Sequence, residues 1–177
     1  MTNIQFLKMH GLGNDFVIID NRKHMLNLST SQIRELSNRK RGIGCDQLIT
    51  METSKTNADI KMRIYNSDGS EVGACGNAAR CIGRLMMDEK NNSQVQIESM
   101  DRVLLATRSN ELISVNMGQA AIDWRDIPLS QKMDTISLEI NEGILKNPVA
   151  VNVGNPHMVF FVKNINEIDL GSIGPKL

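Results

Sequence analysis

The sequence has few aromatic residues, few cysteines and no excess of charge of either sign. Its 177 residues include four Phe, one Trp and one Tyr, so little is available to stack on nucleic-acid bases. The 20 basic side chains balance the 20 acidic ones, and a chain without net charge exerts no global field on nucleic acid or anionic lipid. We therefore expect no nucleic-acid partner.

Long hydrophobic runs are also lacking. No apolar stretch approaches the roughly 20 residues of a membrane helix, and the first six residues have neither the basic head nor the apolar stretch of a signal peptide. We therefore expect a cytoplasmic protein with no membrane partner. Cys45, Cys75 and Cys81 lack zinc-site spacing, so we expect free thiols and no metal site.

Strand patterns far outnumber helical ones. One helix is predicted from a cap at Thr30 or Ser31 to about Lys40, and a second over 77–90. Strands are predicted over 4–9, 15–20, 47–52, 58–66, 95–99, 103–108, 112–116, 135–140, 149–153 and 158–162. This pattern favours an α+β fold over a doubly wound sheet. The mixed polarity of 119–133 divides the chain into domains 1–118 and 119–177.

Cys75 stands at the predicted start of the second helix, between Gly73-Ala74 and Gly76-Asn77. Unpaired N–H groups at a helix N-terminus favour a thiolate and attract a substrate carboxylate, which glycines allow to approach closely. A thiol base beside an anion-binding turn suits proton abstraction next to a carboxylate. The alternative is a small buried residue at a glycine-assisted helix cap.

The other candidate positions have simpler interpretations. Cys81 falls on the apolar face of the same helix and is expected in the core, whereas Cys45 has room for exposure but no activating neighbour. The polar turns 13–15, 66–69 and 154–157 each suit ordinary turn chemistry, because Asn, Asp and Gly are the usual turn residues. No glycine cluster matches a phosphate-binding loop, so no nucleotide cofactor is indicated.

Five stretches taken together resemble the diaminopimelate epimerase family. They are FLKMHGLGNDF (6–16), GIGCDQL (42–48), IYNSDGSEV (64–72), CGNAARC (75–81) and GNPH (154–157), in family order. Two related types are the proline racemases and the phenazine-biosynthesis isomerases. The GLGNDF and NSDGS stretches favour diaminopimelate over proline, and Cys75 argues against the phenazine type, which resembles the fold without the cysteine pair.

The resemblance implies an enzyme without a cofactor that interconverts LL- and meso-diaminopimelate, a precursor of lysine and peptidoglycan. It implies two similar lobes, each with strands wrapped around a central helix, and a small-molecule substrate between them. Each lobe presents one cysteine at a helix N-terminus: a thiolate removes the α-proton, and a thiol returns a proton to the opposite face. Inversion requires acid and base on opposite sides of one carbon.

The resemblance also assigns roles to residues. Cys75 matches the catalytic cysteine of the first lobe, and His157 matches a histidine that tunes the protonation of the thiol pair. Substrate-binding positions are matched by Asn14, Gln47, Asn66, Gly76, Asn77 and Asn155. Gly76 and Asn77 would hold the reacting end of the substrate, and Asn66 and Asn155 the distal end. Ala78 replaces a common family glycine, a change we expect to be tolerated.

No cysteine follows Cys81, so the family's second cysteine motif has no counterpart here. The expectation is a truncated form with an incomplete second lobe, or one piece of a split enzyme, that does not epimerise alone. The alternative is a non-catalytic remnant or half of a split enzyme, acting as an amino-acid-binding or assembly module. A partly built lobe exposes apolar area that promotes self-association, and a homodimer is one such assembly.

Overall fold

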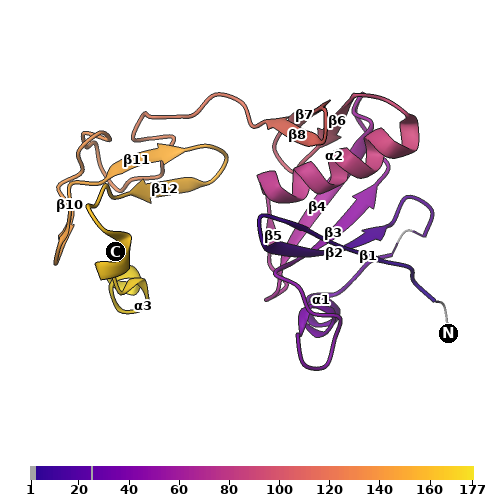
Figure 1. Cartoon of the computed structure of the whole chain (residues 1–177), viewed down its shortest axis with the longest axis horizontal. Coiled ribbons are helices and arrows are strands. Elements are labelled where there is room, and N and C mark those ends of the chain that lie inside the picture. Colours follow the sequence, from indigo (N-terminus) through magenta and orange to yellow (C-terminus); the bar gives the residue numbers. More distant parts are fainter. Residues whose placement is uncertain (1–2, 25) are drawn as a thin grey trace. The chain divides into compact units, whose positions relative to one another are not determined.

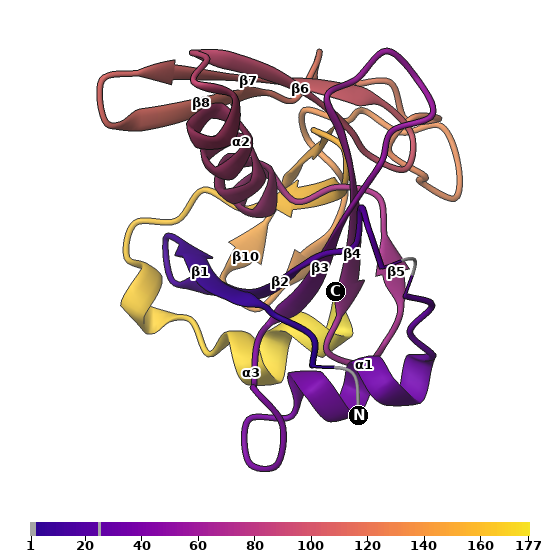
Figure 2. The ribbon, with the colours of Figure 1, turned by 90° about the vertical axis from the view of Figure 1, so that its right-hand side faces the viewer.

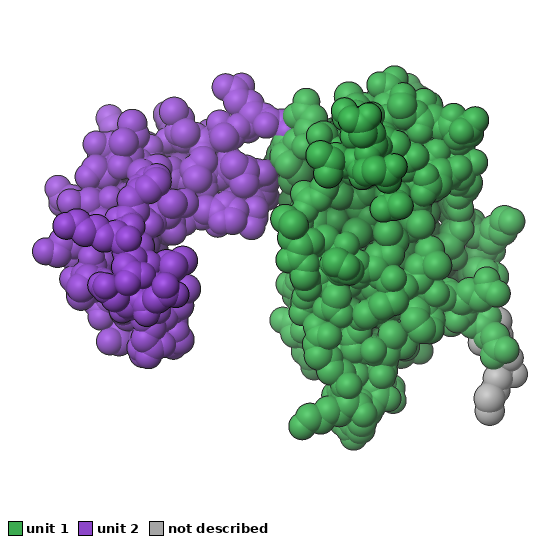
Figure 3. All heavy atoms as spheres, viewed as in Figure 1, with its two compact units in different colours: residues 1–117 green, residues 118–177 purple. Residues whose placement is uncertain are grey.

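The computed structural model describes residues 3–24 and 26–177, which form two compact units, 1–117 and 118–177. Figure 1 labels the elements, and Figure 3 colours the two units separately. No helix among the described residues is long and apolar enough to cross a membrane.

The first unit is built on one eight-stranded sheet. Its strands are β1 (Leu7–Gly11), β2 (Asn14–Asp20), β3 (Gln47–Glu52), β4 (Ile60–Asn66), β5 (Glu71–Val72), β6 (Gln94–Glu98), β7 (Val103–Ser109) and β8 (Leu112–Asn116). The spatial order is β1-β2-β3-β4-β6-β7-β8, with β5 paired to β4. The β2–β3 and β4–β6 pairs are parallel, and the others are antiparallel. The predicted α+β fold is confirmed.

Helix α2 (Gly76–Lys90) lies against one face of this sheet, and the strands curl around it (Figure 2). Its buried positions follow the three-to-four residue spacing of one helix face. They are Ala78, Ala79, Cys81, Ile82, Gly83, Met86 and Met87. They pack on alternate residues of the strands, such as Ile49 and Ile64, and form the main core. The helix ends where Asn91 takes a left-handed conformation (φ 50°).

Helix α1 (Thr30–Ser37) covers the opposite face. Ser29, and not Thr30 or Ser31, is its N-cap, because Ser29 and Gln32 exchange side-chain-to-backbone hydrogen bonds in a capping box. The helix also ends earlier than Lys40. Ile33 packs here in a second core with Cys45, which is only 2% exposed. Cys45 is therefore buried, although its sequence position left room for exposure, and Cys81 is buried as predicted.

The second unit contains short elements. They are β9 (Asn141–Glu142), β10 (Leu145–Lys146), β11 (Val149–Asn152), β12 (Pro156–Val159), the 3-10 helices η1 (Ile165–Glu167) and η2 (Gly174–Lys176), and α3 (Leu170–Ile173). The predicted strand 135–140 is wrong: these residues form turns, and Leu138 is buried against Ile127 and Ala150. The final predicted strand is displaced, because β12 begins at Pro156 and ends at Val159.

Gly83 offers a test of the packing under α2. A Cβ atom at this position would lie 2.8 Å from the Cβ of Ala106 on β7. Such crowding costs about 1–3 kcal/mol, which outweighs the ~1 kcal/mol that alanine gains over glycine inside a helix. We expect Gly83→Ala to lower the free energy of unfolding by about 1 kcal/mol in urea denaturation. Arg84→Ala, on the exposed face, is the control, and a Gly83→Ala protein more stable than the wild type would contradict this packing.

Candidate active site

Cys75 is the N-cap of α2. Its backbone is extended (φ −151°, ψ 106°), and its Sγ accepts a hydrogen bond from the Ala78 N–H at 3.4 Å. The predicted place of Cys75 at a helix start is therefore confirmed. Gly76 is the first residue of the helix, and a Cβ there would meet nothing closer than Met117 Sδ at 3.5 Å. Packing therefore does not require a glycine at this position.

The β1–β2 hairpin brings Asn14 to the start of this helix. Its Oδ1 accepts from Cys75 Sγ at 3.6 Å and from Asn77 Nδ2 at 3.4 Å. The approach depends on Gly11, where an added Cβ would lie 3.1 Å from Asn77 Cβ. Asn14 therefore joins two other residues assigned from the resemblance, Cys75 and Asn77, although it lies more than 60 positions before them.

A charged cluster holds the hairpin from behind. Arg39 Nη2 donates to Asp15 Oδ1 at 2.6 Å and to Asp46 Oδ1 at 2.7 Å, and Lys8 Nζ donates to Asp15 Oδ2 at 2.7 Å. Hydrogen bonds from Arg39, and then from Lys8, keep the pKa of the Asp15 carboxyl well below its usual range against the opposing effect of burial. No local pattern in the sequence predicts this cluster; its only signal is that Lys8, Asp15 and Asp46 lie within the resembling stretches.

Gln47 and Asn66 form a second polar pair on the same face of the sheet. They are opposite each other in the β3–β4 register, and Gln47 Nε2 donates to Asn66 Oδ1 at 3.0 Å. Side chains alternate along a strand, so both face the α2 side, as Ile49 and Ile64 do. Gln47 Oε1 is a buried acceptor with no hydrogen-bond partner among the described residues. A buried acceptor of this kind is available to a ligand.

Asn155 and His157 lie in the second unit, at the β11–β12 hairpin. His157 is opposite Val151, and its Nε2 lies 3.0 Å from Asn155 Oδ1. The two residues are therefore held together by a side-chain hydrogen bond. Within residues 3–24 and 26–177, no three His, Cys, Asp or Glu side chains gather to form a metal site.

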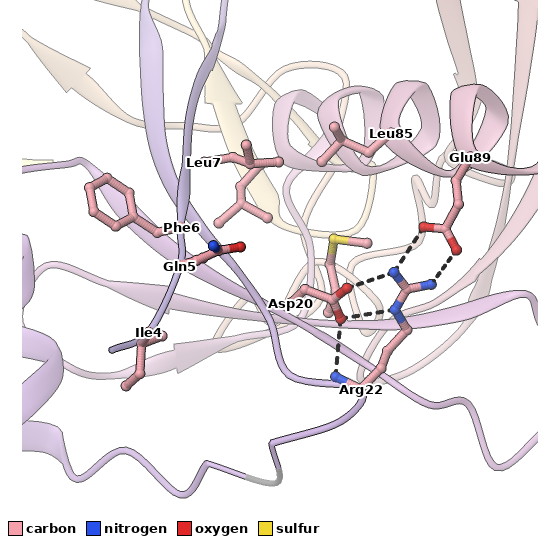
Figure 4. A pocket seen from close by; sticks show the side chains of 10 residues that line it. Ile4, Gln5, Phe6, Leu7, Asp20, Arg22, Leu85 and Glu89 are labelled. Atoms are coloured by element: carbon pink, nitrogen blue, oxygen red, sulfur yellow. Dashed lines mark hydrogen bonds and ion pairs between the residues drawn. The ribbon is translucent and has the colours of Figure 1, made fainter. Parts of the chain in front are cut away.

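A hollow of about 550 Å³ contains none of the predicted site residues. It lies between the segment that leads into β1 and the C-terminal half of α2 (Figure 4). Arg22 in this hollow donates to Asp20 at 2.6 and 2.9 Å and to Glu89 at 2.7 and 2.8 Å. Because two carboxylates already engage its guanidinium, Arg22 joins the end of β2 to α2 and has little capacity for an external anion.

The family model for diaminopimelate epimerase matches residues 6–122. The chain is 49% identical to a diaminopimelate epimerase from Wolbachia sp. subsp. Brugia malayi over 172 residues, which cover 96% of this chain and 64% of that protein. It is 43% identical to one from Rhodospirillum centenum over 175 residues, covering 98% of this chain and 60% of the relative.

Two solved structures share the fold at low sequence identity. A phenazine biosynthesis protein of the PhzF family from Bacillus anthracis has a TM-score of 0.59 at 17% identity, covering 94% of this chain and 58% of its own. A predicted epimerase from Pseudomonas aeruginosa has a TM-score of 0.59 at 14% identity, and the match covers 97% of this chain and 67% of that protein.

The chain spans about 60–64% of the length of these two sequence relatives. The family match covers most of the first unit, including α2 and the residues around Cys75. At 43–49% identity over nearly the whole chain, this similarity extends well beyond a shared fold. The chain belongs to the diaminopimelate epimerase family.

Proposed function

We propose that this chain carries one half of the acid–base machinery of a cofactor-independent diaminopimelate epimerase. In this proposal Cys75 exchanges the α-proton on one face of the substrate carbon. The observation that carries it is the position of Cys75 Sγ at the N-cap of α2, within hydrogen-bonding reach of the Ala78 N–H and of Asn14 Oδ1. The matching positions of the family's substrate-binding residues support the same function.

In this proposal, the start of α2 provides the groups needed to remove the α-proton. As a thiolate, Cys75 takes the α-proton, and the electron pair left on carbon is delocalised into the adjacent carboxylate. That carboxylate becomes more negative, and the first turn of α2 has N–H groups that lack intrahelical acceptors and attract anions. The partial positive charge of the helix end thus stabilises the charge that develops during proton removal. Gly76 and Asn77 are the first two residues of this turn.

The distal end of diaminopimelate is a second amino-acid group, which needs polar ligands. Gln47 and Asn66 supply carboxamides on the α2 face of the sheet, and Gln47 Oε1 is an acceptor in need of a donor. An ammonium group is such a donor. The roles proposed for Asn155 in distal binding and for His157 in tuning the thiols are supported by the family resemblance.

Inversion also needs a proton donor on the opposite face of the carbon. Cys45 and Cys81 are buried in the two cores, and no cysteine follows Cys81. In the two-thiol mechanism, neither of these buried cysteines is placed to act as the second thiol. The 177-residue chain is expected to exchange the α-proton without inverting the carbon.

Cys75 is tested by incubating the chain with LL-diaminopimelate in D2O and following the α-proton by NMR. Positioned acid–base catalysis contributes about 10²–10⁴ in rate, so we expect Cys75→Ala to reduce exchange at least ~100-fold. Cys45→Ala removes a thiol from the other face of the sheet and serves as the matched control. Exchange at the wild-type rate in Cys75→Ala would refute the proposed role. Formation of meso product by the isolated chain would refute the need for an external thiol, and binding without exchange would favour an amino-acid-binding module.

Asn66 is tested by comparing two ligands. Lysine shares the reacting end and the distal ammonium group of diaminopimelate but lacks its distal carboxylate. We expect Asn66→Ala to weaken binding of LL-diaminopimelate about tenfold, since a hydrogen bond to a charged group contributes about 1.5–3 kcal/mol, and to change lysine binding far less. NMR titration measures both dissociation constants, with Asn57→Ala on the surface as control. Equal losses for the two ligands would contradict a contact with the distal carboxylate.

A further inference from the structure

Asp46 is not among the residues that the family resemblance assigns to the site, yet it holds one of them. Its Oδ2 accepts from Asn14 Nδ2 at 3.2 Å and from the backbone N–H of Asp15 at 3.1 Å. Its Oδ1 accepts from Arg39 Nη2 at 2.7 Å, and its own N–H donates to Asp15 Oδ1 at 3.0 Å. These contacts fix the position of the Asp46 carboxylate although its side chain is partly exposed.

The charge of Asp46 determines which way the Asn14 carboxamide faces. A carboxylate only accepts hydrogen bonds, so Asn14 must direct its Nδ2 toward Asp46. The Asn14 Oδ1 then faces the other way, toward Cys75 Sγ at 3.6 Å and Asn77 Nδ2 at 3.4 Å. The oxygen and nitrogen of this amide therefore cannot exchange places without breaking the bond to Asp46.

The other end of this chain of hydrogen bonds is fixed by a donor. Arg80 Nη2 donates to Asn77 Oδ1, and a guanidinium only donates. Asn77 must therefore present its Nδ2 to Asn14. The sequence of donations runs from Arg80 through Asn77 and Asn14 to Asp46, with a cation at one end and a carboxylate at the other. Both amides are oriented by charge, because each end of the chain allows one direction only.

The orientation of the Asn14 amide places a hydrogen-bond acceptor against the thiol of Cys75. Cys75 Sγ faces one donor, the Ala78 N–H at 3.4 Å, and one acceptor, Asn14 Oδ1 at 3.6 Å. A donor stabilises the thiolate, whereas an acceptor can bond only to the protonated S–H. We propose that Asp46 is a positioning residue that keeps the Asn14 acceptor on Cys75 and so stabilises the protonated thiol, the form that Cys75 has once it has taken the α-proton. The inference concerns the thiol of the proposed function, but its test does not require turnover.

The test is the rate at which iodoacetamide alkylates Cys75 in the 177-residue chain at pH 7, followed by peptide mass spectrometry. The thiolate is the nucleophile in this reaction. In Asp46→Asn the Asn14 amide loses its obligatory acceptor, and only the long 3.4 Å bond from Asn77 Nδ2 still opposes turning its Nδ2 toward the sulfur, a turn that favours the thiolate. We expect alkylation to become about threefold to tenfold faster, the effect of one hydrogen bond. Asp88→Asn, the same substitution at an exposed ion-paired position of α2, is expected to leave the rate within about twofold.

Loss of a negative charge near a thiol also favours the thiolate without any role for Asn14. The two causes separate in the Asn14→Ala background. If Asp46 acts by orienting Asn14, the acceleration by Asp46→Asn disappears there; if it persists in full, the proposal is overturned. If circular dichroism shows that Asp46→Asn does not fold, Asp46→Glu replaces it, because this variant keeps the charge and displaces the carboxylate. We again expect faster alkylation in the wild-type background and no acceleration in the Asn14→Ala background. The proposed epimerase function fails on a different measurement, the absence of α-proton exchange in D2O, so the two failures are distinguishable.

Discussion

The packing of α2 against the curled sheet is the interaction on which the rest of the first unit depends. Ile82 and Met86 bury the apolar face of the helix, and Gly83 lets its backbone approach Ala106 on β7. A helix held along one face cannot rotate or slide without exposing that face to water, at ~25 cal/mol per Å² of apolar area. The same packing therefore fixes where the helix begins, and with it the position of Cys75.

The polar groups around Cys75 are held by the charged cluster at the β1–β2 hairpin. Isolated ion pairs on a surface contribute little, but Lys8, Asp15, Arg39 and Asp46 form a connected network with several short hydrogen bonds. Its effect is geometric: it joins the hairpin to the loop before β3. Small polar side chains such as Asn14 have few rotatable bonds, so fixing their backbone and one hydrogen bond fixes their orientation.

Fold and chemistry carry different information in this family. Proteins at 14–17% identity share the fold, and a shared fold does not imply a shared reaction. In the function proposed above, the chemistry rests on the residues at the start of α2 and on its side of the sheet. Cys75 provides a group that can gain and lose a proton, and the carboxamides of Gln47 and Asn66 provide polarity without charge.

The sequence by itself determined the local elements that have a strong period. It predicted β3 and β8 at their observed bounds and α2 to within one residue, because alternation and helical spacing record which side chains are buried. It misplaced the strand over 135–140, where apolar residues pack from turns. The flanking glycines and the helical spacing that follows also predicted Cys75 at a helix start, and the family motifs matched it to a catalytic cysteine. Only the tertiary structure decided that Asp46 orients Asn14, since that bond joins residues 32 positions apart and depends on how two loops meet, which no local pattern encodes.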